Sequence, residues 1–149
     1  MKKQPNPWEL GATLYMPATR KDIAEVVLEG KIPGLRSLVV CLEDAVSEHD
    51  IPLAIQNLSL FLKQLRHARA VNDDEKYPLV FIRPRHPDMG GWLTTNLDLS
   101  AVDGFVLPKF TLSTLPVWWD IMAGTSLMMM PTLETEEVYD VIKMQALAN

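Results

Sequence analysis

Short, continuous apolar segments alternate with segments of helical periodicity along this chain of 149 residues. Apolar runs of this length, rich in β-branched side chains, are typical of strands buried on both faces of a parallel sheet. Apolar residues at helical spacing between them predict helices that cover the sheet. Five such runs predict strands, at residues 12–17, 37–42, 79–82, 104–108 and 127–133. The alternation therefore indicates a parallel β/α architecture.

The segments between these runs carry helix signals of different strength. The spacing of Thr19 and Asp22 predicts a capping box at the start of the first helix. Residues 113–122 predict the fourth helix. The connection at residues 85–96 is longer than most in β/α folds and contains Gly90-Gly91, so we interpret it as a functional loop.

Two architectures fit this alternation. An open doubly wound sheet would be complete at this length, whereas a closed β/α barrel typically needs about 250 residues. Periodicity alone does not choose between them.

Composition narrows the classes of partner. The formal net charge of −5, with lysines and arginines scattered, argues against nucleic acid or an anionic membrane as the main partner. No apolar stretch approaches the roughly 20 residues that a membrane helix needs. Cys41 is the only cysteine, so no disulfide forms within the chain, and we expect a cytoplasmic protein.

Each predicted strand ends in polar or charged residues. Because parallel strands share one carboxyl edge, these residues are expected at one rim, where β/α folds bind ligands. Solvation of the strand ends, or ion pairs that hold the rim together, would explain the same pattern. The rim residues are Arg20, Glu43, Asp44, Arg83, Arg85, Lys109 and Glu134.

Two other features have simpler interpretations. His86 is expected on the surface of the long connection. The pair Trp118-Trp119, at the spacing of a helix, predicts a core or subunit contact, and together with exposed strand edges it leads us to expect a homo-oligomer.

Five short motifs, in order and in strand context, resemble those of one family. Residues 14–20 (LYMPATR) resemble its opening "LFVPGSR", and residues 42–46 (LEDAV) match its signature. Ile82-Arg83, residues 106–109 (VLPK) and residues 133–135 (LET) resemble its "VR", "LPK" and "IET". The chain thus resembles the HpcH/HpaI aldolase and citrate lyase β-subunit-like family, in wording closest to the branch associated with tellurite and stress-resistance operons.

The resemblance implies a (β/α)₈ TIM barrel of the pyruvate/phosphoenolpyruvate type, with residues 1–149 forming the N-terminal part of one truncated barrel domain of about five β/α units. It implies a C–C bond lyase or aldolase acting through a metal-stabilised enolate on a small oxo-acid or acyl-CoA. It also implies Mg²⁺ (or Mn²⁺) as cofactor. The residues carried over are Glu134 as metal ligand; Arg83, Glu43 and Asp44 as catalytic residues; and Arg20, Arg85 and Lys109 as substrate-binding residues.

Departures from the family pattern leave an alternative open. Cys41 stands where the family usually has aspartate, and Pro84 where it has asparagine. The family's second metal carboxylate would follow a sixth strand, which we expect beyond Asn149. The alternative is a catalytically degenerate barrel that serves as a binding or assembly module in a stress (tellurite) resistance system.

Overall fold

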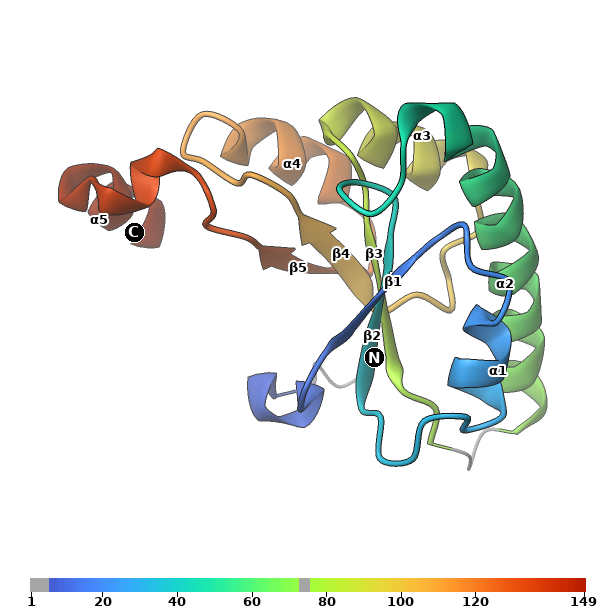
Figure 1. The fold of residues 1–149 in the computed structure, drawn as a ribbon. Helices are drawn as coiled ribbons and strands as arrows, with labels where there is room; N and C mark the ends of the chain where they lie inside the picture. Colours follow the sequence, from blue (N-terminus) through green and yellow to red (C-terminus); the bar gives the residue numbers. More distant parts are fainter. Residues whose placement is uncertain (1–5, 73–75) are drawn as a thin grey trace.

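The computed structural model describes residues 6–72 and 76–149. The elements are, in order, η1 (Pro7–Leu10), β1 (Leu14–Pro17), α1 (Ile23–Leu28), β2 (Ser37–Cys41), η2 (Glu48–Asp50), α2 (Ile51–Val71), β3 (Leu79–Arg83), α3 (Pro87–Asn96), β4 (Gly104–Leu107), α4 (Leu115–Met122), β5 (Met128–Pro131), η3 (Glu136–Tyr139) and α5 (Val141–Ala148). The strands form one sheet in the order β1-β2-β3-β4-β5 (Figure 1). Every neighbouring pair is parallel.

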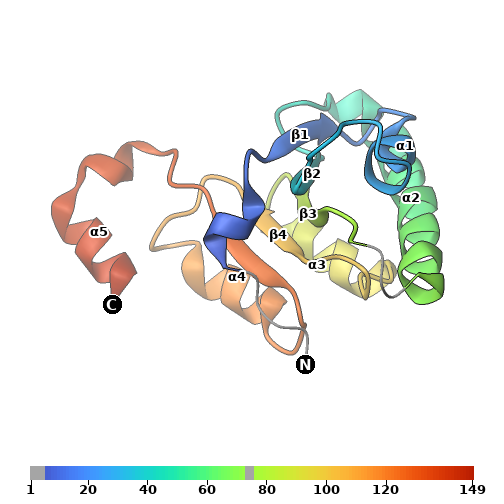
Figure 2. The ribbon, with the colours of Figure 1, turned by 90° about the horizontal axis from the view of Figure 1, so that it is seen from below.

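The strand order decides between the two architectures that the sequence left open. A doubly wound sheet reverses its strand order at a switch point and carries helices on both faces, whereas a barrel adds strands in sequence with its helices outside. Here the order is sequential, and helices α1 to α4 lie along the outer side of the curved sheet (Figure 2). The fold is therefore part of a β/α barrel.

The two faces of the sheet bury different sets of residues. Leu38 and Val40 of β2 belong to the larger core, which lies between the sheet and the helices. Between them in sequence, Val39 points to the other face, where it clusters with Phe81 and Val106. This alternation follows from the period of two in a strand. The inner cluster is covered in part by Leu10 of η1.

The segment predicted to be a functional loop is instead helix α3, so that prediction was wrong. His86 caps the helix, because its Nδ1 accepts a hydrogen bond from the backbone N–H of Met89 at 3.1 Å. Of the two glycines that suggested a loop, Gly90 has a packing reason. A Cβ on Gly90 would lie 2.6 Å from the ring of Trp118, so glycine lets α3 approach α4 closely.

The prediction of a capping box at the start of α1 also needs correction. Asp22 precedes α1 but makes no capping hydrogen bond. Its carboxylate instead accepts hydrogen bonds from Arg20, at 2.6 and 2.8 Å, and from Lys31 at 3.0 Å. These cationic partners outcompete the helix amides for the Asp22 oxygens, and no capping box forms.

The sequence predicted that all five strands are buried on both faces, but the structure buries only some of them. Strands β2, β3 and β4 are almost fully buried. The edge strands β1 and β5 each have one neighbour within the described residues, and they leave Tyr15 and Met129 partly exposed. Trp118 belongs to the core, whereas Trp119 is 61% exposed and is the only member of that pair available for a subunit contact.

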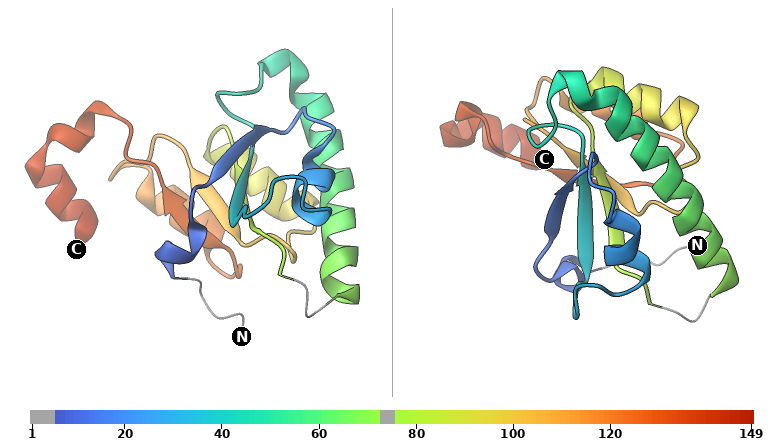
Figure 3. Two further views of the ribbon diagram at one scale, coloured as in Figure 1. Left: turned by 60° about the horizontal axis from the view of Figure 1, so that its bottom comes forward. Right: turned by 45° about the vertical axis from the view of Figure 1, so that its right-hand side comes forward.

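After β5 the chain leaves the body of the molecule. The segment that contains η3 and α5 extends away from the sheet (Figures 1 and 3), and Leu147 of α5 is the part of it that packs, partly buried, against the larger core. None of the α5 residues is buried, and its N-cap Asp140 accepts a hydrogen bond from the Lys143 amide. Across the described ranges, no helix combines the length and apolar character that crossing a bilayer would require.

Candidate functional site at the carboxyl rim of the sheet

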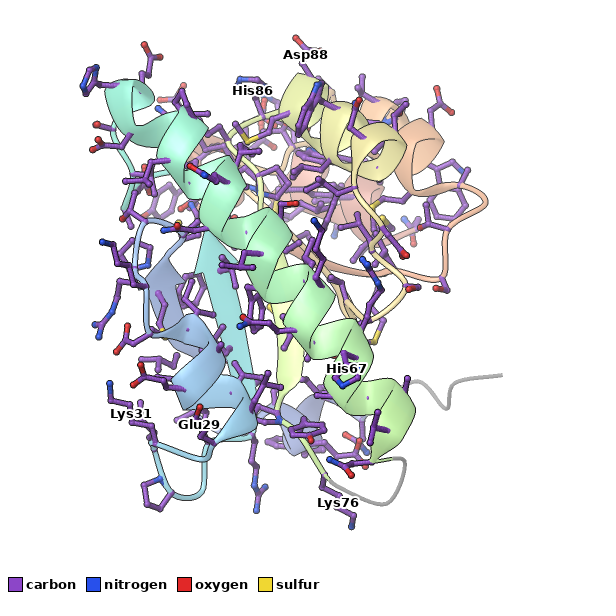
Figure 4. The ribbon with its side chains drawn as sticks, turned by 90° about the vertical axis from the view of Figure 1, so that its right-hand side faces the viewer. Glu29, Lys31, His67, Lys76, His86 and Asp88 are labelled. Carbon is purple, nitrogen blue, oxygen red and sulfur yellow. The ribbon has the colours of Figure 1, made fainter. Side chains whose placement is uncertain are left out.

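The charged residues that follow the strands lie at one end of the sheet, where the strands finish. Figure 4 labels both ends: His86 and Asp88 lie where β3 gives way to α3, and Lys31 and Lys76 lie at the opposite end. Glu43 and Asp44 follow β2 after Leu42, and Arg83 is the last residue of β3. The end at which the strands finish is the ligand-binding rim of β/α folds.

Arg83 is at the centre of a charged cluster on this rim. Its Nη2 lies 2.8 Å from Glu43 Oε2, 2.9 Å from Glu134 Oε1 and 3.4 Å from Asp44 Oδ2. The side chain is 9% exposed, and its Nε is buried without a hydrogen-bond partner among the described residues. Burial lowers the pKa of Arg83, but Glu134 and Glu43 outweigh it and hold that pKa above its ordinary value.

Glu43 is the buried carboxylate of the cluster, and both of its oxygens have partners. Oε2 accepts from Arg83 and from the Asp44 amide at 3.0 Å, and Oε1 lies 3.2 Å from Lys109 Nζ. Burial raises the pKa of Glu43, but its interactions with Asp44, Lys109 and Arg83 together hold that pKa below the ordinary value. Glu43 is therefore a fixed anion that orients its neighbours.

Glu134 is held through one oxygen. Its Oε1 accepts from Arg83 at 2.9 Å, from the Lys109 amide at 2.9 Å and from the Thr132 hydroxyl at 3.0 Å. Burial raises the pKa of Glu134, but the Lys109 amide, the Thr132 hydroxyl and the Arg83 charge lower it further than burial raises it. Oε2 makes no hydrogen bond to any described residue, so it is available to a ligand.

Asp44 is the exposed carboxylate of the group. Its side chain is 70% exposed, and it reaches Arg83 only at 3.4 Å. A hydrogen bond to the adjacent Glu43 carboxylate raises the pKa of Asp44, because that bond favours the protonated carboxyl, and partial burial and the Glu43 charge raise the pKa further. Asp44 therefore offers carboxylate oxygens at the open side of the cluster.

The remaining rim residues predicted to bind substrate have different surroundings. Lys109 joins the cluster through Glu43 and Glu134. Arg85 donates to the backbone carbonyls of Leu42, Glu43 and Val46, at 3.3, 3.1 and 2.6 Å, and so holds the turn that carries Glu43. Arg20 pairs with Asp22 and makes no contact with the cluster among the described residues.

The donor set fits a hard divalent cation in part. Mg²⁺ needs only one or two protein carboxylates, because it keeps several waters. Glu134 Oε2 and the exposed Asp44 carboxylate meet that need, whereas both oxygens of Glu43 already have partners. Within residues 6–72 and 76–149, no three aspartate, glutamate, histidine or cysteine side chains form a complete metal cage.

A hollow of about 940 Å³ lies at the opposite end of the sheet. Its charged lining includes Arg69, which pairs with Asp103 at 2.9 Å and donates to the carbonyls of Ala101 and Pro78. Asp103 also accepts from the Val80 amide at 2.8 Å. These groups tie α2 to the start of β3 and β4, so the rim cluster is the better candidate site.

A barrel-type sheet with convergent carboxylates and a buried arginine at its carboxyl rim defines a class of β/α-barrel proteins with a polar ligand site. The comparison with family models identifies the family within that class. The model described as the C–C bond lyases of the TIM-barrel fold matches residues 4–149, and the chain belongs to this family. A comparison with curated proteins gives no match.

Two functional contacts in the cluster were not predicted from the sequence. Thr132 donates to Glu134, and the backbone amide of Lys109 does the same. The threonine two residues before a rim glutamate was a usable signal, because the predicted strand runs to residue 133 and an extended chain places residues i and i+2 on one side, although β5 itself ends at Pro131. The amide contact depends on a backbone angle, for which the sequence gives no sign.

Proposed function

We propose that this protein is a Mg²⁺-dependent C–C bond lyase or aldolase of the HpcH/HpaI and citrate lyase β-subunit-like branch. Its substrate would be a small oxo-acid or an acyl-CoA. The observation that carries the proposal is the position of the Arg83 guanidinium, which is buried between Glu43 and Glu134 at the rim while Glu134 Oε2 stays open.

The chemistry needs charge stabilisation at one oxygen. When a C–C bond beta to a carbonyl breaks, its electron pair moves onto the carbonyl group and gives an enolate. The other fragment becomes a carbonyl compound as its hydroxyl group loses its proton to solvent water. A bound Mg²⁺ would supply Lewis-acid stabilisation of that enolate oxygen. Glu134 would hold the ion, and Asp44 would order water on it.

Arg83 would add the second stabilising charge. Salt bridges fix its Nη2, so the guanidinium does not have to reorganise when negative charge develops nearby. The Nε and Nη1 donors are left without carboxylate partners among the described residues. Glu43 holds the guanidinium in place, and its buried charge keeps the arginine ionised.

Calorimetric titration of Mg²⁺ and Mn²⁺ into the protein tests the metal assignment. Glu134→Gln is expected to abolish binding, because it removes the charge of the ligand while keeping its shape. Glu136→Gln is the matched control, because Glu136 lies in η3 nearby but outside the cluster. Equal affinity of wild type and Glu134→Gln contradicts the metal site.

Turnover separates the enzyme from its alternative. A panel of small oxo-acids and acyl-CoA esters is assayed for release of a carbonyl product, with wild type and Arg83→Lys. We expect Arg83→Lys to lower kcat while leaving Mg²⁺ affinity unchanged, since lysine keeps the charge but not the planar fork. Metal binding without turnover of any substrate in the panel would favour a degenerate barrel that acts as a binding or assembly module.

A further inference from the structure

Lys109 has the most unusual backbone at the rim. Its φ is +49°, and it is the one non-glycine residue with a positive φ among the residues that the structure describes. This left-handed conformation is unfavourable for a side chain that carries a Cβ, and such residues cluster at functional sites. The side chain is 65% exposed, so core packing does not explain why a lysine stands here.

The left-handed turn directs two successive amides toward the end of β5. The Lys109 N–H donates to Glu134 Oε1 at 2.9 Å, and the Phe110 N–H donates to the Thr132 carbonyl at 3.0 Å. The second bond anchors the turn to the backbone that carries Glu134. The first holds the Glu134 carboxylate itself, on the side of the site formed by β5.

The Lys109 side chain reaches the other side of the site. Its Nζ lies 3.2 Å from Glu43 Oε1, while Glu43 Oε2 is bonded to Arg83. A single residue, Lys109, therefore contacts both the carboxylate that follows β2 and the carboxylate that follows β5. Both carboxylates also bond to the same nitrogen of Arg83.

We propose that Lys109 is a positioning residue that holds the two carboxylates through two separate parts of its structure. The left-handed amide fixes Glu134, and the ammonium fixes Glu43, so the carboxylates stay on opposite sides of Arg83. Glycine would adopt the turn without strain but lacks the ammonium, which explains a strained lysine at this position. This positioning role depends on the proposed function only for the task that the two carboxylates then perform.

Substitutions at Lys109 separate the two parts. Lys109→Gly keeps the turn and removes the ammonium. Lys109→Val also removes the ammonium, and its β-branched side chain strongly disfavours the turn. Lys109→Ala is intermediate and serves if the valine variant does not fold. Lys109→Arg keeps the cation, and its side chain disfavours the left-handed turn as much as lysine does.

The readout is the ¹³C chemical shift of the Glu43 and Glu134 side-chain carboxylates at pH 7, with hydrogen exchange of the residue 109 amide. We expect Lys109→Gly to change the Glu43 signal, to leave the Glu134 signal unchanged and to keep the residue 109 amide protected from exchange. Lys109→Val should change both carboxylate signals and expose the amide, with Lys109→Ala between the two. Lys109→Arg should restore the Glu43 signal.

Two outcomes overturn the proposal: a Glu134 signal that is the same in the glycine and valine variants, or a Glu43 signal that is indifferent to removal of the ammonium. The Mg²⁺ affinity of the same variants is a separate measurement. We expect a loss of about tenfold for Lys109→Val, as for other residues that orient metal ligands. If wild type binds no Mg²⁺, the proposed function fails, while the carboxylate signals still decide the role of Lys109.

Discussion

Removal of the Arg83 guanidinium is expected to destabilise the protein through the charge it leaves behind. Glu43 is 5% exposed and Arg83 is 8% exposed, so the pair is buried. Breaking a buried pair by removing one partner costs about 3–5 kcal/mol. Glu43 keeps the Lys109 ammonium and the Asp44 amide, which places Arg83→Met near the lower end, at about 3 kcal/mol.

The other two carboxylates add little to this figure. The side chain of Glu134 is 36% exposed and that of Asp44 is 70% exposed, and exposed pairs contribute about 0–1 kcal/mol. The loss therefore comes mainly from Glu43, and neutralising Glu43 should relieve it. Arg83→Met combined with Glu43→Gln should be no less stable than Arg83→Met alone, with a coupling energy of about 1.5–3 kcal/mol.

Urea denaturation of wild type, both single variants and the double variant measures this coupling. The m value should stay constant, so that midpoint changes report stability. Arg20→Met is the matched control, because Arg20 is 53% exposed and, among the described residues, pairs with Asp22 alone, so its urea midpoint should stay close to that of wild type. If the costs of Arg83→Met and Glu43→Gln simply add, the two side chains do not form the buried pair described above.

Two further predictions concern helix packing and pH. Gly90→Ala should lower the thermal midpoint, because the added Cβ would lie 2.6 Å from the buried ring of Trp118. Gly91→Ala, whose Cβ would have its nearest neighbour at 3.9 Å, should raise the midpoint by about 2–4 °C through helix propensity. Equal shifts of the two midpoints would contradict the tight contact. The pKa of Asp22 is depressed, first by its hydrogen bond with Arg20. The stability advantage of wild type over Asp22→Asn should therefore be complete above about pH 4 and decline as the pH falls below that value. Urea midpoints of both proteins from pH 7 to 2 measure it, and a difference independent of pH would contradict the depressed pKa.

The parallel β/α order could be predicted because it rests on local patterns. Buried parallel strands read as unbroken apolar runs, and all five strands lie within the predicted ranges or one residue beyond them. Helix α3 was missed because Pro87, Gly90 and Gly91 favour loops by local propensity. The contact of Gly90 with Trp118 is a tertiary interaction between α3 and α4, and no local pattern reports it.

The convergence of rim residues could be predicted from strand direction alone, whereas their individual partners could not. Arg83 ends β3 and Glu134 follows β5, 51 residues later in the chain, and yet Arg83 Nη2 and Glu134 Oε1 lie 2.9 Å apart. Arg85, two residues after Arg83, shares its chemistry but donates to backbone carbonyls of the turn after β2. Which of two nearby arginines faces the ligand site depends on where carbonyls of another segment lie, and that information is not local.

The charge balance of the cluster links its structure to the proposed chemistry. Three carboxylates, of Glu43, Asp44 and Glu134, surround two cations, Arg83 and Lys109, so the cluster has a net charge of −1 when all are ionised. That excess favours a cation over an anion as the first ligand. A divalent cation would change the balance to +1, which would in turn attract a carboxylate or an enolate. The arrangement therefore predicts ordered binding, with metal first and an anionic substrate second, and substrate affinity measured with and without Mg²⁺ by calorimetry should show dependence on the metal.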